Sequence, residues 1–214
     1  MKSTRVWFAA GVVAVSVMVA GCSGGSAAGH ASAAVEAATS SAPPAKTLPY
    51  AGAPKVQDPL PDSVVSGHPC DGALTSAQVE KLLSKELPGD HDDQAALGPQ
   101  CHWINSDVGA GVSVLYATKV SDGLSAVYSN TKPQATVWRP LPLIMGLPAV
   151  AHSTYGNGGS KSFCQISVGI SDRQVVAISV NLSPAKVSSN TDPCEAAGKA
   201  ADMVIGNLKQ KAGS

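Results

Sequence analysis

One stretch of the chain decides the fold, and it reads Phe163-Cys164-Gln165-Ile166-Ser167-Val168-Gly169-Ile170. Its apolar residues at every second position alternate with Gln165, Ser167 and Gly169. Successive side chains of a β-strand point to opposite faces of a sheet, so this alternation predicts a strand with one buried face. Working outward, similar runs predict further strands over residues 101–105, 112–118, 137–139, 149–154 and 175–182. Asn157-Gly158-Gly159 is expected to form a turn between the strands on either side.

Helix signals stand at both ends of this strand-rich region. Thr75-Ser76-Ala77-Gln78 is typical of a capping box that opens a helix, which we expect to end at Pro88-Gly89. Asp192-Pro193 combines a good N-cap with a favoured first helical residue and predicts a C-terminal helix. A short helix is expected over residues 124–128. Strands between flanking helices indicate an α+β fold, with a largely antiparallel sheet flanked by an N-terminal and a C-terminal helix.

The first residues have the layout of an export signal. Lys2 and Arg5 precede an uncharged, mostly apolar run over residues 6–19, which is shorter than the roughly 20 residues that a membrane-spanning helix needs. The following Val19-Ala20-Gly21-Cys22 resembles the lipobox of bacterial lipoproteins. The resemblance implies cleavage before Cys22 and attachment of acyl chains, such as palmitate, at that cysteine. An ordinary secretory signal or an uncleaved anchor is the alternative.

We therefore divide the chain into three parts. Residues 1–21 are expected to be a signal peptide. Residues 22–64, rich in Ala, Ser and Pro, are expected to form a disordered tether that begins at lipidated Cys22, because they hold too few large apolar groups to offset the entropy of ordering. Residues 65–214 are expected to form the folded domain. The tether would hold this domain at the extracytoplasmic face of the cell membrane.

The five cysteines form an even set once Cys22 is assigned to lipid. The remaining four are Cys70, Cys101, Cys164 and Cys194. Three pairings are possible, and we favour Cys70–Cys101 and Cys164–Cys194, because each joins a helix start to a strand nearby in sequence. The four cysteines lack the tight spacing of a metal or redox motif. We expect two structural disulfides, no metal site and no cofactor.

Several short motifs resemble one family of actinobacterial lipoproteins. They are Cys101-His102-Trp103, Gly146-Leu147-Pro148-Ala149-Val150, the strand at residues 163–168, and Asp192-Pro193-Cys194-Glu195-Ala196-Ala197. The family is domain of unknown function 3558, and the resemblance covers roughly residues 65–209. The chain departs from the family pattern at Asp71-Gly72-Ala73-Leu74, because family members often have Leu-Leu soon after the first cysteine. The resemblance implies an envelope lipoprotein and supplies no catalytic residues.

The charged and catalytic signals are weak. Basic and acidic side chains balance at 15 each, so the surplus of Lys and Arg needed for binding nucleic acid is missing. His91 among Asp90, Asp92 and Asp93 could bind a divalent cation, but without calcium-loop spacing we expect a solvated loop. His102 should face outward if Trp103 faces the core. His152 and Tyr155 near Cys164 would suggest a Cys–His nucleophile, which a disulfide would remove.

Two function hypotheses remain open. The first is a non-catalytic binding or accessory module for an envelope protein, lipid or wall component, and the second is an enzyme acting on envelope material, with Asp90–Asp93 and His102 as its best candidates. A Pro-punctuated apolar run over residues 138–148 is either a core-covering crossover or an exposed lip for a ligand or partner. The possible binding surface consists of Leu141, Leu143, Ile144, Met145 and Leu147.

Overall fold

The computed structural model describes residues 46–155 and 161–213. The expected signal peptide, Cys22 and the first half of the expected tether lie outside these residues, and so does the expected turn at residues 157–159. Among the described residues, no helix combines the length and apolar composition needed to cross a bilayer.

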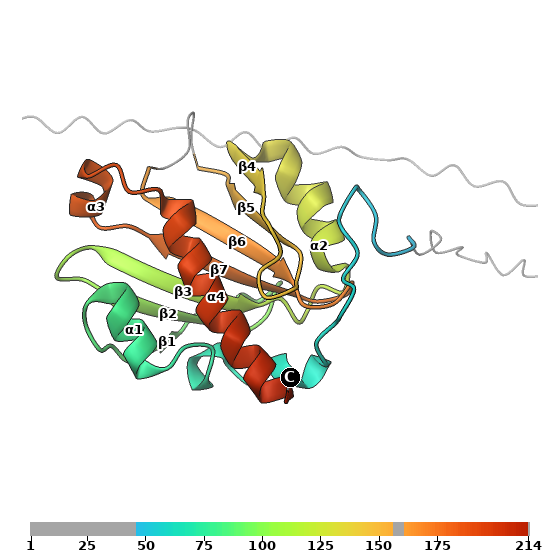
Figure 1. Ribbon diagram of the computed structural model, residues 1–214, viewed down its shortest axis with the longest axis horizontal. Helices are drawn as coiled ribbons and strands as arrows, with labels where there is room; N and C mark the ends of the chain where they lie inside the picture. Colours follow the sequence, from blue (N-terminus) through green and yellow to red (C-terminus); the bar gives the residue numbers. More distant parts are fainter. Residues whose placement is uncertain (1–45, 156–160, 214) are drawn as a thin grey trace, which may run out of the picture. The chain divides into compact units, whose positions relative to one another are not determined.

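The described residues hold one antiparallel sheet of seven strands, in the order β1-β2-β3-β7-β6-β5-β4 (Figure 1). The strands are β1 (Asp90–His91), β2 (Gln100–Asn105), β3 (Ala110–Tyr116), β4 (Val137–Pro140), β5 (Ala149–Ser153), β6 (Phe163–Gly169) and β7 (Val175–Asn181). The helices are α1 (Ser76–Leu83), α2 (Gly123–Ala126), α3 (Pro184–Ser188) and α4 (Pro193–Ala212). The expected α+β fold with an antiparallel sheet is confirmed.

Two meanders build this sheet. β1, β2 and β3 pair in chain order, and so do β4, β5, β6 and β7. After β3 the chain passes through α2 and the π-helical turn η3 (Val127–Thr131) to the far edge at β4. The second meander then returns until β7 pairs with β3, so one ladder joins the two halves.

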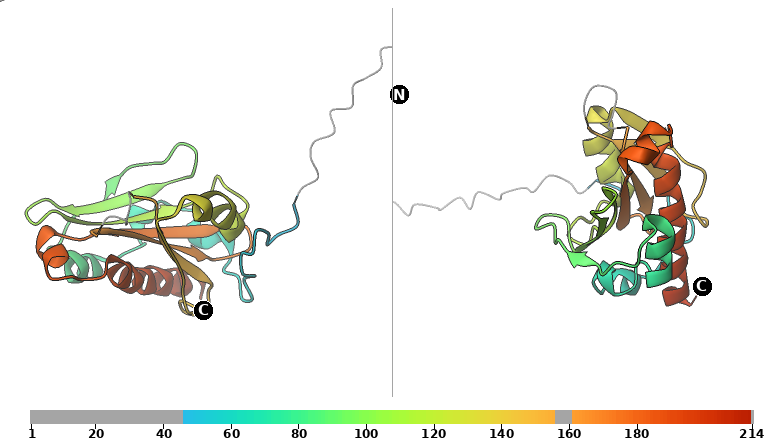
Figure 2. Two further views of the ribbon diagram at one scale, coloured as in Figure 1. Left: turned by 90° about the horizontal axis from the view of Figure 1, so that it is seen from above. Right: turned by 90° about the vertical axis from the view of Figure 1, so that its left-hand side faces the viewer.

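The sheet is covered differently on its two faces. α4 packs across β6 and β7 on one face, and α2 lies on the other (Figure 2). The face toward α4 carries the main core, which includes the fully buried Val114, Ile166 and Ile178. A smaller cluster around Leu124, Tyr128 and Val150 lies under α2.

The expected alternation in β6 holds at Ile166, which faces the main core, and at Gln165, which is half-exposed. Toward the end of the strand both faces are buried, because Ser167 and Gly169 are buried as well.

Short hydrogen bonds fix the ends of α1. The Thr75 hydroxyl accepts from the Gln78 N–H, and the Gln78 side chain accepts from the Thr75 N–H, which confirms the expected capping box. The helix ends earlier than expected, however, because Ser84 adopts a left-handed conformation with φ of 58°. The Asn105 side chain donates to the Leu83 carbonyl at 2.9 Å and satisfies one of the free acceptors at this end.

A disulfide and an ion pair hold the start of α4. Cys194 in its first turn is bonded to Cys164 on β6, and Cys70 is bonded to Cys101 on β2, so both favoured pairings are confirmed. The Asp192 carboxylate caps the helix by accepting from the Cys194 N–H at 2.8 Å. The same carboxylate lies 2.7 Å from the guanidinium of Arg139 on β4, and this contact lowers the Asp192 pKa.

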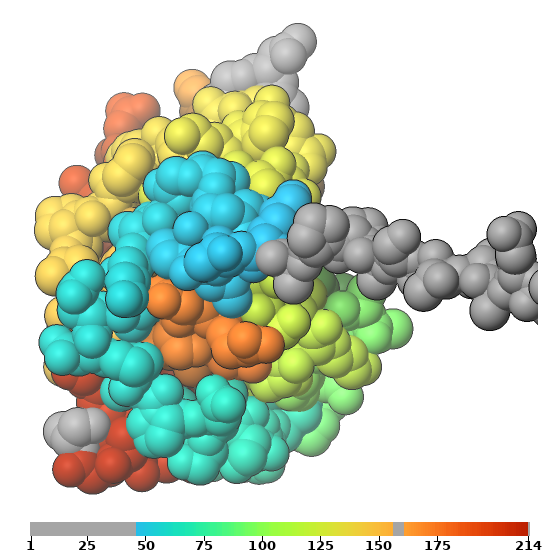
Figure 3. Space-filling model, turned by 90° about the vertical axis from the view of Figure 1, so that its right-hand side faces the viewer, coloured from blue at the N-terminus to red at the C-terminus, as the bar shows by residue number. Residues whose placement is uncertain are grey.

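Residues 46–64 pack against the domain and extend it beyond the expected boundary at residue 65. This N-terminal segment, cyan in Figure 3, lies over the turn between β6 and β7. Val56 and Leu60 are 4% and 6% exposed, and the Leu60 N–H donates to the Ile170 carbonyl at 2.8 Å. A few well-placed apolar residues thus suffice to dock a Pro-rich stretch whose composition alone predicts a tether.

Two short elements also escaped the sequence-based assignment. β1 lies in the expected loop at residues 89–99, and α3 follows β7 directly. β1 has only two residues, too few to show a period, and both of its side chains are exposed. The Ser183 hydroxyl caps α3 and Pro184 occupies its first helical position, and this pair is a local helix-start signal in the sequence.

The docking of the N-terminal segment can be tested by Leu60→Ala. Because Leu60 is buried in the main core, we expect its truncation to lower the free energy of unfolding by about 2–5 kcal/mol. The matched control is Leu143→Ala, since Leu143 is 65% exposed and should change stability by less than about 0.5 kcal/mol. Urea unfolding of the disulfide-intact chain measures both. Equal stabilities for the two variants would mean that residues 46–64 are not part of the folded unit.

Candidate functional site

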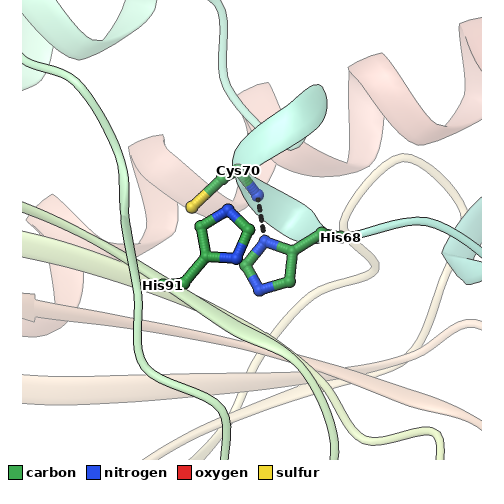
Figure 4. A group of neighbouring side chains, drawn as sticks. All are labelled: His68, Cys70 and His91. Carbon is green, nitrogen blue, oxygen red and sulfur yellow. Dashed lines mark hydrogen bonds between the residues drawn. The ribbon is translucent and has the colours of Figure 1, made fainter.

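His68, Cys70 and His91 gather beside the first disulfide (Figure 4). The two imidazole rings are stacked, with centroids 3.6 Å apart and planes 5° from parallel. His68 Nδ1 accepts a hydrogen bond from the backbone N–H of Cys70 at 3.1 Å, and His68 Nε2 lies 2.9 Å from Asp93 Oδ1. The cluster therefore ties the start of η2 (Pro69–Asp71) to the segment that follows β1.

This geometry suits a structural tie rather than a metal centre. The Cys70 sulfur is bonded to Cys101 and is not a thiolate ligand. Since Nδ1 of His68 accepts a hydrogen bond, the proton of the neutral ring sits on Nε2 and is donated to Asp93, which leaves His68 no lone pair for a metal. That hydrogen bond also lowers the pKa of the Asp93 carboxyl.

The acidic side chains around His91 do not converge on one point. Asp93 turns toward His68, while Asp92 Oδ2 lies 2.8 Å from His102 Nε2 on the other face of the β1–β2 pair. His102 is half-exposed and Trp103 is buried, as expected from their alternation on β2. The cation-binding interpretation of this loop has no support in the arrangement of these carboxylates.

The contact between Asp92 and His102 continues to a hydroxyl. His102 Nδ1 lies 2.8 Å from the Oγ of Ser113 on β3, which places a carboxylate, an imidazole and a hydroxyl in sequence. Ser113 stands in the middle of β3, however, and the backbone of that strand is used in ladders with β2 and β7. These ladders engage the N–H groups that an oxyanion would require. The chain of contacts orients side chains on the sheet face.

The expected apolar binding surface is divided between core and solvent. Ile144 and Leu147 are 7% and 1% exposed and belong to the main core, and Leu141 packs against it. These three residues are therefore not a surface, because the turn they flank folds back on the sheet. Leu143 and Met145 are exposed, and Met145 occupies a tight turn with φ of 49°. The crossover interpretation holds for most of the run.

His152 is buried next to the second disulfide. Its Nε2 lies 2.9 Å from the Ser167 hydroxyl, and burial lowers the pKa of the imidazole to about 4. Cys164 is bonded to Cys194, so it has no free thiol that could act as a nucleophile with His152. At neutral pH His152 is an uncharged hydrogen-bonding group on the sheet face under α2.

An apolar hollow bordered by lysines lies at one end of the sheet, where α1, α3 and the start of α4 meet. We call it the basic groove. It has a volume of about 360 Å³, within the range of small-molecule sites. Its lining is mainly apolar, with Leu82 and Leu83 from α1, Val112 from β3, Leu182 after β7 and Ala196 from α4.

Three lysines stand around this apolar lining. Lys81, Lys186 and Lys199 come from α1, α3 and α4, and all three side chains are exposed. Within the described residues, none of their ammonium groups has an ion-pair or hydrogen-bond partner, and Glu195 is the one carboxylate of the lining. The whole chain is electrically balanced, so this local excess of positive charge marks the groove as complementary to an anion.

Hydrogen bonds hold the groove walls in place without using its lysines. The amides of Gln78 on α1 and Asn207 on α4 bond reciprocally at 2.7 and 3.2 Å, and Asn207 also donates to the Ala73 carbonyl. Together with the disulfide at Cys194 they fix α1 and α4 on the same face. The groove is therefore largely preformed, which lowers the entropic cost of binding a ligand.

Comparison with protein-family models gives one match, to DUF3558, a protein of unknown function, over residues 17–207. The chain belongs to the DUF3558 family. The expected membership of domain of unknown function 3558 is thereby confirmed. No curated protein and no solved structure matches this DUF3558 chain. Its function must therefore be argued from the groove and the sheet themselves.

Sequence reasoning missed the basic groove of this DUF3558 protein. Its three lysines lie on separate elements, about 105 and 13 positions apart along the chain, and no local pattern links them. Only Lys81 offers a partial signal, because it stands next to the apolar pair Leu82-Leu83 within a predicted helix. The groove emerges when β7 is placed beside β3, which brings α1 and α3 together.

Burial of His152 predicts a pH-dependent stability. The folded pKa of about 4 lies below the value of about 6.5 for an unfolded chain, so the unfolded state takes up a proton first as pH falls. His152 should thus leave the free energy of unfolding unchanged above pH 7 and should lower it by about 2 kcal/mol at pH 5. The variant His152→Gln keeps an uncharged hydrogen-bonding side chain and should lose this component. Urea unfolding at both pH values measures the difference; identical pH dependence in the two proteins contradicts it.

Proposed function

We propose that this protein is a lipoprotein of the cell envelope, anchored through Cys22, whose domain binds an anionic amphiphile in the basic groove. The ligand class is an acyl chain carrying a carboxylate or phosphate head. The observation that carries the proposal is the groove itself, a mainly apolar hollow of about 360 Å³ bordered by three lysines that have no partner among the described residues. The domain would act as a binding module at the extracytoplasmic face of the membrane.

The lining of the groove suits both the hydrocarbon chain and the anionic head of such a ligand. Leu82, Leu182 and Ala196 offer apolar surface that a hydrocarbon chain would cover, at roughly 25 cal/mol for each Å² removed from water. The ammonium groups of Lys186 and Lys199 offer charge-assisted hydrogen bonds to an anionic head. A neutral lipid would leave the lysines uncompensated, and a small hydrophilic anion would leave the apolar wall exposed.

The proposed location at the membrane rests on the first residues of the chain. The positive residues Lys2 and Arg5, the apolar run and the lipobox-like Val19-Ala20-Gly21-Cys22 support export followed by lipidation at Cys22. The two disulfides are consistent with an oxidising compartment. A membrane anchor would keep the groove close to a pool of amphiphiles and raise their effective concentration.

Ligand capture can be tested in membranes that contain the full-length protein. A photoreactive diazirine fatty acid should crosslink to peptides of the groove, and the matching fatty alcohol should crosslink much less because it lacks the charge. Replacing Lys81, Lys186 and Lys199 together by Gln should lower the fatty-acid yield about tenfold, since exposed charge pairs contribute up to about 1 kcal/mol each. Quantitative peptide mapping measures the yield.

The control is Lys55→Gln, which removes an exposed lysine outside the groove and should leave the yield unchanged. A photoreactive anionic phospholipid, used in parallel, distinguishes a membrane lipid from a free fatty acid. Equal labelling by the acid and the alcohol, or full labelling of the triple variant, would remove the groove as an anion site.

Lipidation is tested separately by the mass of the mature chain. Protein extracted from membranes should begin at an acylated Cys22, and its mass should rise by four hydrogen atoms when a reductant supplies two electrons and two protons to each disulfide. Cys22→Ser should move the protein from the membrane fraction to the soluble or secreted fraction, because two or more acyl chains supply the stable attachment at roughly 0.8 kcal/mol for each buried CH₂. An unacylated native chain would contradict the anchor while leaving the groove proposal intact.

A further inference from the structure

The face of the sheet opposite α4 carries a continuous row of polar residues. The strand registers place His102 opposite Ser113, Ser113 opposite Ser179, Ser179 opposite Gln165, and Gln165 opposite His152. We call these five residues the polar row. They come from β2, β3, β7, β6 and β5, so the row runs perpendicular to the strands, which lie about 4.8 Å apart.

The two ends of the row have different characters. At one end Asp90 of β1 stands opposite His102, and at the other Trp138 of β4 stands opposite His152. Asp90 carries a carboxyl group and His152 is buried, so the accessible and uncharged part of the row runs from His102 on β2 to Gln165 on β6, three interstrand steps or about 14 Å. α2 covers only part of this side of the sheet (Figure 2).

Three hollows of 290, 230 and 320 Å³ follow the polar row. The first is lined by His102, Ser113 and Ser179. Gln165 and His152 line both of the others, and Phe163 lines the first and the last. The shared residues make these hollows neighbours along one track rather than separate depressions.

The hollows differ from the basic groove in charge. Among the described residues, no Asp, Glu, Lys or Arg lines any of the three, whereas three lysines surround the groove. A nucleic acid or another polyanion requires cations along its path, and this track offers none. The polar row presents hydroxyls, amides and imidazoles, which recognise neutral hydrogen-bonding groups, and the middle hollow adds apolar residues such as Leu115 and Val127.

Part of the hydrogen-bonding capacity of the row is unused. Within the described residues, neither the Gln165 amide nor the Ser179 hydroxyl has a hydrogen-bond partner, although both residues are only half-exposed. Their neighbours are held firmly: Ser113 by His102, which Asp92 orients in turn. An unpaired polar group flanked by oriented ones is the arrangement of a preformed polar site.

Aromatic rings stand beside the centre of the row. Phe163 lies two residues before Gln165 on the same strand face, and the ring of Tyr155 meets it edge-on at 4.8 Å with 57% of Tyr155 exposed. Aromatic faces pack against apolar C–H surfaces, while hydroxyls and amides bind polar edges. Sugar rings present both kinds of surface, with C–H groups on their faces and hydroxyls at their edges.

We propose that the polar row binds a neutral, extended oligosaccharide that lies across the strands. The uncharged lining selects against acidic glycans, and the length of the track favours a chain of several sugars over a single one. This site is separate from the basic groove and does not rest on the ligand proposed there.

Binding can be measured by calorimetry with the full-length chain in a polyoxyethylene detergent, which carries no sugar. The probes are neutral hexasaccharides of glucose, N-acetylglucosamine, mannose, galactose and arabinose, with oligogalacturonate as the acidic comparator. At least one neutral hexasaccharide should bind with a millimolar or lower Kd, and its disaccharide should bind much more weakly. Failure of every neutral probe, or equal binding of oligogalacturonate, overturns the proposal.

Variants then locate the site. Gln165→Ala and Ser179→Ala should each lower affinity about fivefold, the value of one neutral hydrogen bond, without unfolding the domain, because neither side chain bonds within the described residues. Gln210→Ala, on the exposed end of α4, is the matched control and should bind like the parent. The triple lysine variant of the basic groove should also bind normally. Unchanged affinity in both row variants would place any sugar binding elsewhere and contradict the assignment.

Discussion

The ladder between β3 and β7 is the pairing on which the rest of the structure depends. Every other pair in the sheet joins strands that are neighbours in the chain, whereas this ladder joins two meanders through six residue pairs from Gly111–Asn181 to Tyr116–Val176. A slip of β3 by one residue against β7 would turn Val114 away from the main core and Ser113 toward α4, and a slip of β7 would do the same to Ile178 and Ser179. Burial of the apolar set therefore fixes the register, and the register in turn makes the polar row continuous.

The same ladder produces two surfaces of opposite chemistry. At one end of the sheet, on the face toward α4, the ladder brings Leu182, which follows β7, close to Val112 of β3. Helices α1, α3 and α4 complete the basic groove around these two residues. On the other face the ladder aligns Ser113 with Ser179 in the polar row, and no Asp, Glu, Lys or Arg among the described residues lines the hollows there. The Cys164–Cys194 disulfide ties the start of α4, one wall of the groove, to β6, the strand that carries Gln165 of the polar row. Both surfaces are consequently built on one core.

The sequence predicts those parts of the fold that repeat or carry a local signature. Alternation gives β6, the Thr75 and Asp192 caps give the starts of α1 and α4, and chain proximity favours the observed disulfides. It does not predict that residues 46–64 dock, because Val56 and Leu60 are isolated among prolines and their partners lie more than a hundred positions away. The polar row was hidden for a related reason: its members are single positions on five strands, and only the registers bring them together.

The two proposed ligands differ in charge, because the two surfaces differ in their charged side chains. An uneven distribution of charge allows a chain of zero net charge to carry both surfaces. Fifteen cations and fifteen anions cancel globally, yet the lysines of the groove lack carboxylate partners among the described residues while Lys85 and Arg139 elsewhere are paired. Unpaired cations at an apolar hollow favour an anionic head, whereas an uncharged polar track gains nothing from one. A protein held at a membrane through Cys22 could thus contact an amphiphile at the sheet end and a neutral glycan on the sheet face without either ligand competing for the other surface.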